Sequence, residues 1–222
     1  MSFIKKYLSY LNVISERTYK SSYNGTLEIN WVNGKKILDT KNTNYSYGNL
    51  GKVLHKGLSN VKSTNYDENS NILVLGLGGG DVIKQLRNNF KSNATITAVE
   101  IDPIIIEIAI NEFDILPNKK LEIVNTDAQI FLKYTKQKYN LIIVDLFNDT
   151  EIPDFVFQTS FIKNLHDCLD TNGNIIFNTF ILYDEHEIRN KKFVLNLKKH
   201  FSVKEFKKLY GHNHLIITEI TP

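Results

Sequence analysis

The stretch NILVLGLGGGDV, residues 71–82, decides the fold class of this chain. Its apolar half has no polar alternation, which is typical of a strand buried on both faces of a parallel sheet. The strand runs into four glycines, Gly76, Gly78, Gly79 and Gly80, which let the backbone turn tightly and approach a ligand closely. A helical pattern begins directly after them. The stretch therefore predicts a buried strand, a ligand-binding turn and a helix in succession.

The same unit recurs outward from this stretch, because apolar strands alternate with helical segments to the end of the chain. The strands are expected at 71–77, 94–101, 121–126, 140–146, 174–180, 203–209 and 214–220, and the helices at about 80–91, 103–113, 127–135, 158–169 and 185–200. Such alternation predicts an α/β fold, in which helices cover both faces of a mostly parallel sheet. We expect a doubly wound, Rossmann-like sheet of seven strands, with ligands at the carboxyl ends of its strands.

Residues 1–44 have a different pattern and are expected to form a separate N-terminal domain. Two Asn-Gly dipeptides, in YNGT and VNGKK, each lie between runs of alternating apolar residues, which is the sequence signature of β-hairpins. We expect a short helix at 3–11 and then a small antiparallel β-meander of three strands. The second domain, residues 45–222, is expected to begin with a helix at 45–59, followed by a polar linker at 66–70.

Composition and charge indicate which binding partners and which cellular compartment fit this chain. The chain of 222 residues has a net charge of +3 in scattered positions, and its lysine pairs are too short for a nucleic-acid-binding arm. The single cysteine, Cys168, excludes an internal disulfide and fits a reducing compartment, where it is expected to pack as a small buried hydrophobe. No apolar stretch is long enough for a signal peptide or a membrane span. We therefore expect a soluble, cytoplasmic protein with no nucleic-acid or membrane partner.

Acidic residues occupy the places where predicted strands end, the edge at which such sheets bind ligands. Glu100 ends the second strand about 20 residues after the glycine turn, where an acid typically accepts hydrogen bonds from ribose hydroxyls. Asp81 starts a helix and suits its dipole. It would repel a pyrophosphate, so it favours an amine-bearing cofactor over NAD. Asp127 either caps the next helix or accepts a hydrogen bond from an adenine amino group, whereas Asp102, before Pro103, is expected to be a helix cap.

A second acidic cluster follows the fourth strand of the sheet, in the stretch YNLIIVDLFNDTEIPDF. Asp145 ends that strand in line with the other acids, and it is expected to face the reacting part of a bound ligand. Glu151 and Asp154 are expected to face water.

Three further residues have more than one interpretation. His212 and His214 fit a metal site or an exposed turn, and because no third ligand is visible we predict the turn and no metal. Trp31, on the N-terminal meander, fits the core of the domain and the core of a dimer equally.

Four motifs in order, VLGLGGGD, AVEIDP, NTDAQIFL and YNLIIVDLFNDTEIP, resemble those of the spermidine synthase-like branch of the class I S-adenosylmethionine-dependent transferases. Upstream, TLEINWVNGKKILDT is similar to the small N-terminal sheet of that family and NYSYGNLGKVL to its tyrosine-bearing helix start. The resemblance covers about residues 13–220. It implies a sheet of the class I methyltransferase type, a homodimer, and transfer of an aminopropyl group from decarboxylated S-adenosylmethionine to a small-molecule amine.

The resemblance also implies roles for residues at matching positions. It assigns the glycine-rich turn with Asp81, the ribose acid Glu100 and the adenine-side acid Asp127 to binding of the cosubstrate. It assigns Asp145 as the catalytic acid and Tyr47 as a tyrosine of the substrate pocket.

The loop after Asp145 departs from the family's pattern of Asp, two small residues, Asp and Pro. Asn148 stands where the second acid is expected, and Asp149 can replace that acid only if the loop shifts by one residue. Tyr210 lies in a region that is close to the active site in the family. Asn148, Asp149 and Tyr210 are therefore the candidate residues for binding the acceptor. A second departure places Val82 where the family has Gly.

Two alternatives to aminopropyl transfer stay open at this point. The same nucleoside pocket would serve a methyltransferase that uses S-adenosylmethionine on a small acceptor, although Asp81 would repel the carboxylate of that cosubstrate. Because Asn148 weakens the hold on a second ammonium group, the chain also fits a non-catalytic protein that binds nucleosides or polyamines. The preferred interpretation is a transferase of the aminopropyltransferase type, with decarboxylated S-adenosylmethionine or S-adenosylmethionine as cosubstrate and no metal.

Overall fold

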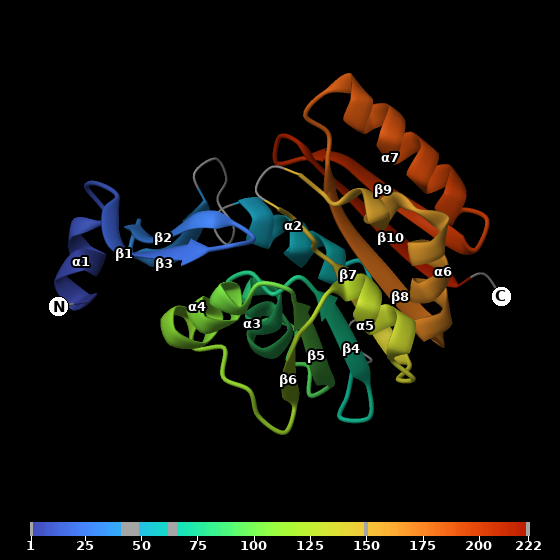
Figure 1. The fold of residues 1–222 in the computed structure, drawn as a ribbon, viewed down its shortest axis with the longest axis horizontal. Helices are drawn as coiled ribbons and strands as arrows, with labels where there is room; N and C mark the ends of the chain where they lie inside the picture. The colour runs from blue at the N-terminus through green and yellow to red at the C-terminus, as the bar shows by residue number, and fades with distance from the viewer. Residues whose placement is uncertain (1, 41–48, 62–65, 149–150, 221–222) are drawn as a thin grey trace.

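The computed structural model describes residues 2–40, 49–61, 66–148 and 151–220, which form two sheets and the helices around them (Figure 1). The smaller sheet is N-terminal and antiparallel, with the strand order β1-β2-β3. It consists of β1 (Ile14–Ser21), β2 (Gly25–Val32) and β3 (Lys35–Thr40), and the helix α1 (Ser2–Leu8) precedes it. The predicted meander is confirmed, and α1 is shorter than the predicted helix at 3–11.

The larger sheet has seven strands in the order β6-β5-β4-β7-β8-β10-β9. Its strands are β4 (Asn71–Leu75), β5 (Thr95–Glu100), β6 (Leu121–Asn125), β7 (Tyr139–Val144), β8 (Leu169–Phe180), β9 (Phe201–Leu209) and β10 (Asn213–Ile220). Only β10 runs against its neighbours, β8 and β9, so the sheet is mostly parallel, as predicted. β8 begins before the predicted residue 174 because Leu169 already pairs with Tyr139.

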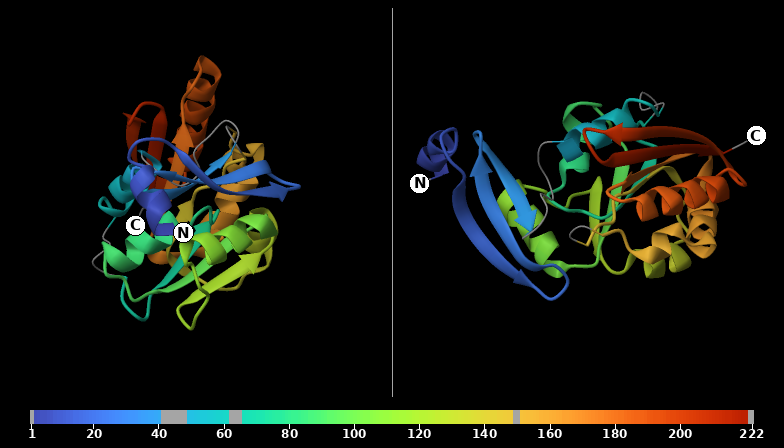
Figure 2. Two further views of the ribbon diagram at one scale, coloured as in Figure 1. Left: turned by 90° about the vertical axis from the view of Figure 1, so that its left-hand side faces the viewer. Right: turned by 90° about the horizontal axis from the view of Figure 1, so that it is seen from above.

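Helices cover both faces of this sheet, which confirms the doubly wound prediction (Figures 1 and 2). One face is covered by α2 (Asn49–Leu58), α3 (Asp81–Asn88) and α4 (Pro103–Phe113), and the other by α5 (Ala128–Tyr134), the 3-10 helix η2 (Asp154–Phe157), α6 (Thr159–Cys168) and α7 (Asp184–Leu197). The first core also contains Leu27, Ile29 and Leu38 of the N-terminal sheet, so the two sheets share buried apolar surface.

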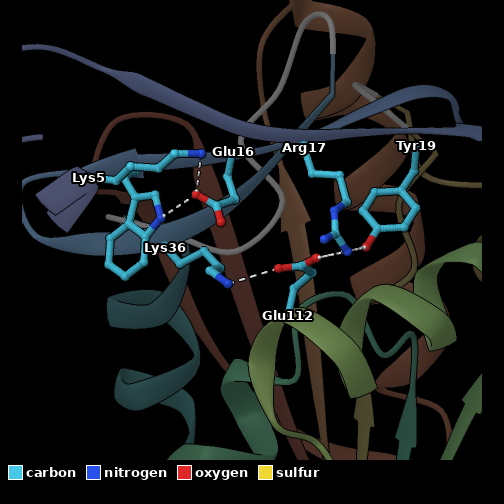
Figure 3. A network of polar contacts seen from close by, with 7 residues as sticks. Lys5, Glu16, Arg17, Tyr19, Lys36 and Glu112 are labelled. Atoms are coloured by element: carbon cyan, nitrogen blue, oxygen red, sulfur yellow. Dashed lines mark hydrogen bonds and ion pairs between the residues drawn. The ribbon is translucent and has the colours of Figure 1, made fainter. Parts of the chain in front are cut away.

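The carboxylate of Glu112 on α4 joins the N-terminal sheet to the larger sheet's helical layer. Its side chain is 6% exposed. It accepts hydrogen bonds from Arg17 Nη1 at 2.9 Å, Tyr19 Oη at 2.8 Å and Lys36 Nζ at 2.8 Å (Figure 3). Burial alone would raise the pKa of Glu112, but the bonds from Lys36 and Tyr19 hold it below its ordinary value. The carboxylate is therefore stabilised in its charged form.

Asp102 forms the second link, and it is fully buried. Its Oδ1 accepts a hydrogen bond from the amide of Ile104 at 2.9 Å, so the predicted helix cap is confirmed. Its Oδ2 also accepts hydrogen bonds from Ser21 Oγ at 2.5 Å, at the end of β1, and from Asn24 Nδ2 at 2.6 Å, in the turn that follows. One carboxylate thus caps α4 and anchors the first hairpin, a second role that the sequence did not indicate.

Three residues discussed from the sequence, Tyr66, Cys168 and Trp31, are all buried in the structure. The predicted linker at 66–70 has no helix or strand, as expected, but its Tyr66 is 7% exposed and donates a hydrogen bond to Asn174 Oδ1 at 3.4 Å. Cys168 is buried, as predicted. Trp31 is also buried within the chain, and its Nε1 donates a hydrogen bond to Glu16 Oε2 at 3.1 Å.

The prediction of an exposed turn was wrong for His214, which is 1% exposed and belongs to β10. Its Nε2 lies 3.2 Å from Glu205 Oε2 on β9, and its Nδ1 lies 3.0 Å from Asn190 Nδ2 on α7. These two partners satisfy the ring in the interior, which is what burial of a polar group requires. His212 is exposed in the preceding turn, as predicted.

Candidate active site

The carboxyl ends of β4, β5, β6 and β7 lie side by side, and the predicted acids follow them along this edge. The glycine-rich turn after β4, which also contains Gly78 and Gly79, is tightly folded, with φ angles of 93° at Gly76 and 74° at Gly80. A Cβ at Gly76 would lie 2.2 Å from the carbonyl oxygen of Asp145, and one at Gly80 would lie 2.3 Å from an isoleucine side chain. Both conformation and space therefore require glycine at these two positions.

Glu100, at the end of β5, holds the glycine-rich turn in place. Its Oε2 accepts a hydrogen bond from the amide of Leu77 at 2.9 Å, and its Oε1 accepts one from the amide of Asp102 at 3.0 Å. Burial raises the pKa of Glu100, and the backbone hydrogen bonds from Asp102, Leu77 and Gly78 oppose that rise. Since each carboxylate oxygen has two lone pairs, Glu100 can hold the turn and still accept hydrogen bonds from a ligand.

Asp127 caps α5, which was one of the two roles predicted for it. Its Oδ1 accepts hydrogen bonds from the amides of Gln129 at 2.7 Å and Ile130 at 3.1 Å. Its Oδ2 takes part in neither bond and can accept a hydrogen bond from a ligand.

Asp81 is the first residue of α3, directly after Gly80. Burial raises the pKa of Asp81, and the charges of Lys84 and Lys35 oppose that rise. Lys35 belongs to β3, so the N-terminal sheet places a cation near the start of α3. The acid is where the sequence predicted it, but two lysines share its surroundings.

Asp145 follows β7, and its amide donates a hydrogen bond to the carbonyl oxygen of Leu75 at 2.9 Å. Its Oδ1 accepts a hydrogen bond from Asn178 Nδ2 at 2.9 Å. Burial raises the pKa of Asp145 to about 6, the bond from Asn178 opposes that rise, and the negative charge of Asp81 adds to it. The two carboxylates are therefore close enough to repel each other, and a cation between them would relieve that repulsion.

Asn178 and Asn213 are the residues of this region that sequence reasoning missed. Asn178 is 2% exposed on β8, and its Oδ1 accepts a hydrogen bond from Asn213 Nδ2 at 3.4 Å on β10. The signal for Asn178 was a single amide in the apolar run IIFNTF, because a buried polar side chain needs a partner.

The loop after Asp145 is closed by a pair of backbone hydrogen bonds between Asn148 and Glu151, at 2.8 and 3.0 Å. Asn148 is exposed, and Glu151 and Asp154 are exposed as predicted. Asp149 lies outside the described residues.

Two predicted tyrosines have different outcomes. Tyr47 lies outside the described residues. Tyr210 is 48% exposed in the turn between β9 and β10, and the Nζ of Lys52 on α2 lies 5.6 Å from the centroid of its ring.

In the described ranges no group of three or more His, Cys, Asp or Glu side chains is placed to hold a metal ion. Among the same residues, no helix combines the length and the apolar character that a membrane crossing needs.

Comparison with known proteins gives consistent matches. A family model described as the spermine/spermidine synthase domain matches residues 51–210. A polyamine aminopropyltransferase of Vibrio vulnificus is 31% identical over 156 residues, which are 68% of this chain and 50% of that protein. The chain thus spans about half the length of the curated relatives it matches.

Solved structures share the fold. A probable spermidine synthase from Corynebacterium glutamicum superposes with a TM-score of 0.76 at 16% identity, covering 91% of this chain and 79% of that one. Human methyltransferase-like protein 13, in complex with SAH, superposes with a TM-score of 0.65 at 20% identity, covering 79% of this chain and 84% of that one. These likenesses confirm a sheet of the class I methyltransferase type.

Proposed function

This chain belongs to the spermine/spermidine synthase domain family, and we propose that it is a transferase. The proposed reaction moves an aminopropyl group from decarboxylated S-adenosylmethionine to an amine acceptor. Relatives named polyamine aminopropyltransferase support the reaction. A spermidine synthase in complex with the transition state analogue AdoDATO has the same fold. Because the chain spans about half of its curated relatives, the proposal rests on the matched half and on the chemistry of its acidic edge.

The single observation that carries the proposal is the pair of half-buried carboxylates, Asp145 and Asp81. An amine near neutral pH is protonated, because its pKa lies near the lysine value of about 10. Two close carboxylates attract such a cation and lose their mutual repulsion when it binds. In the reaction the ammonium gives a proton to Asp145. The nitrogen lone pair then attacks the carbon next to the sulfonium, and the bond from that carbon to sulfur breaks.

The raised pKa of Asp145 suits this transfer. A carboxylate whose pKa lies near 6 takes a proton more readily than one at the ordinary value. We infer that Asn178 orients this carboxylate through its hydrogen bond at 2.9 Å.

The cosubstrate side of the edge fits a nucleoside. The glycine-rich turn gives close access to the backbone, Glu100 has free lone pairs for ribose hydroxyls, and Oδ2 of Asp127 can accept a hydrogen bond from the adenine amino group. Asp81 would attract the amine of the cosubstrate, whether decarboxylated or not, but it would repel the carboxylate that only S-adenosylmethionine has.

One observation favours a second candidate function, methyl transfer from S-adenosylmethionine to a small acceptor. Lys84 and Lys35 both act on the charge of Asp81, and two cations at this position would attract the carboxylate of S-adenosylmethionine. Binding of the two cosubstrates therefore separates the candidates.

The proposal also covers the residues that bind the acceptor amine and the oligomeric state of the chain. Asn148, Asp149, Tyr47 and Tyr210 are proposed to face the acceptor, by their positions in the family's motifs. With Asn148 in place of an acid, a monoamine or a diamine with a weakly held distal end fits better than a tightly held diamine. We also propose a homodimer, as in the family.

Calorimetry tests the proposal, with both cosubstrates titrated into the wild type, Asp81→Asn and Lys35→Gln. A preference for the decarboxylated form that disappears in Asp81→Asn, with mass-spectrometric detection of an aminopropylated amine, would support it. A preference for S-adenosylmethionine that disappears in Lys35→Gln would support methyl transfer instead. Binding of neither cosubstrate by folded protein would overturn both.

A further inference from the structure

A groove of about 470 Å³ lies between η2, the start of α6 and one face of α7. The residues of this groove that matter here are Phe157, Thr159, Arg189, Lys192, Asn196 and Lys199. None of the candidate active-site residues lines it. Figure 2 shows α7 beside α6, and a hydrogen bond from Asn196 Nδ2 to Thr159 Oγ1 at 3.0 Å joins the two helices there. The groove is therefore a second, separate concave surface.

The groove is lined by three cations, Arg189, Lys192 and Lys199, and none of its lining residues is an acid. Residues 189–199, RNKKFVLNLKK, contain five cations and no acid, although the whole chain has a net charge of only +3. Lys192 and Lys199 both line the groove and are exposed. The residues four positions from Lys192 on α7 are not acids, and Lys199 lies beyond the end of that helix, so α7 offers neither lysine an acidic partner within the helix. In the part of the chain that the structure describes, no acidic side chain forms an ion pair with either lysine.

Arg189 is the first cation of the segment 189–199, and its side chain is held in place by two contacts. Its guanidinium carbon lies 4.2 Å from the centroid of the Phe157 ring, and its Nη2 donates a hydrogen bond to the carbonyl oxygen of Phe180 at 3.3 Å. The exposed Asp154 offsets part of its charge. A guanidinium held in this way has lost its side-chain entropy before any ligand binds, so it favours binding of a planar or branched anion.

The size of the groove limits the ligand. Lys192 lies three positions from Arg189, which is about 4.5 Å along α7 at 1.5 Å per residue, and Lys199 follows just after the helix ends at Leu197. Small-molecule sites have volumes of roughly 300–1,000 Å³, so a groove of about 470 Å³ suits a small anion rather than a long polymer. Thr159 begins α6, whose N-terminus has no side-chain cap, so the positive end of this helix dipole adds to the potential there.

We propose that this cationic groove binds a small oligophosphate, either free or carried by a nucleotide. Lys192 and Lys199 contact the phosphate oxygens, and Arg189 holds the end of the phosphate chain. The site is independent of the proposed transferase function and needs no cosubstrate.

Calorimetric titration of the full chain at constant ionic strength tests this site, with sodium triphosphate, ATP and adenosine as probes. The test variant is Lys192→Gln/Lys199→Gln. The control is Lys191→Gln/Lys198→Gln, which removes the same charge from exposed lysines that do not line the groove. Exposed lysines are not needed for folding, and circular dichroism checks that both variants fold.

The expected result is saturable binding of triphosphate and ATP at the groove. Any binding of adenosine belongs to the nucleoside site at the acidic edge, so it should be equal in the wild type and the test variant. Binding of triphosphate should weaken about tenfold in the test variant and less than twofold in the control, because paired charges act at short range. A larger loss of affinity for ATP than for triphosphate in the test variant would identify a nucleotide as the source, and equal losses would identify the phosphate chain alone. Equal weakening in both variants would overturn the proposal, since it would show only general charge attraction. Absence of saturation, or tighter binding of a single-stranded RNA than of triphosphate, would overturn it as well.

Discussion

Replacing Asp145 by Asn is expected to make the folded chain more stable above pH 6 while removing the proposed transfer activity. The substitution keeps an oxygen that can accept the hydrogen bond from Asn178, so it changes charge and little else. The carboxylate is held in the folded chain against an unfavourable environment. Its removal therefore isolates the cost of that charge.

The size of the effect follows from the pKa of Asp145, which burial raises from 3.8 to about 6. At 1.36 kcal/mol for each pKa unit, a difference of about 2 corresponds to about 3 kcal/mol. Water reaches part of this half-buried side chain, so we expect about 2 kcal/mol. The raised pKa means that the folded state binds the proton more tightly. The cost is therefore absent below pH 3.8, grows as the pH rises to 6, and is complete above pH 6.

Urea unfolding of both proteins at pH 5 and pH 8 measures this effect. The stability gain of Asp145→Asn should be about 2 kcal/mol at pH 8 and about half of that at pH 5. The control is Asp154→Asn, an exposed acid near the same loop, whose effect should stay within about 0.5 kcal/mol at both values. A variant that is no more stable than the wild type at pH 8, or a gain that does not change with pH, would refute the reasoning.

Gly76→Ala should destabilise the chain by more than about 3 kcal/mol in urea unfolding, because the new methyl group would meet a backbone carbonyl, whereas Gly25→Ala, with nothing within 4 Å of its Cβ, should cost about 1 kcal/mol. Equal losses would contradict the packing argument. Glu112→Gln weakens three hydrogen bonds to the N-terminal sheet, so we expect a loss of about 1–3 kcal/mol and faster proteolysis of that sheet; unchanged cleavage would count against the anchor. Asn178→Ala removes a bond that lowers the pKa of Asp145, so the acidic limb of the pH–kcat profile should move to higher pH. An unmoved limb would show that Asn178 has no positioning role.

Local sequence patterns were sufficient to predict the fold. The buried strands are uninterrupted apolar runs, and Glu100, Asp127 and Asp145 each stand within two residues of a strand end, so strand position alone located these three acids. Asp81 instead begins α3 after the glycine-rich turn, and the run of glycines between a strand and a helix located both. The roles of these residues remain predictions.

Contacts between distant segments were not predictable from such patterns. Asn178 lies 33 residues from Asp145, and they meet only because β7 and β8 pair in one particular register. The turn predicted around His214 was wrong for the same reason. The partners that make its burial possible, Glu205 and Asn190, come from different elements, and neither is marked as a partner by its own surroundings in the sequence.

The links between the N-terminal sheet and α4 have a consequence for synthesis on the ribosome. Ser21 and Asp102 are 81 residues apart, and Tyr19 and Glu112 are 93 apart. At about 5–20 residues per second, the anchoring carboxylates are made about 4–20 s after the strands that they hold.

During that interval the apolar face of the meander lacks α4, although Leu27, Ile29 and Leu38 are all fully buried in the finished fold. Small sheets that lack a packing partner are marginally stable in water. The nascent chain therefore exposes an apolar surface for several seconds. In that time a chaperone can bind this surface, or neighbouring nascent chains can aggregate through it. The yield of folded protein should accordingly depend on how fast the ribosome translates the segment between the first hairpin and α4.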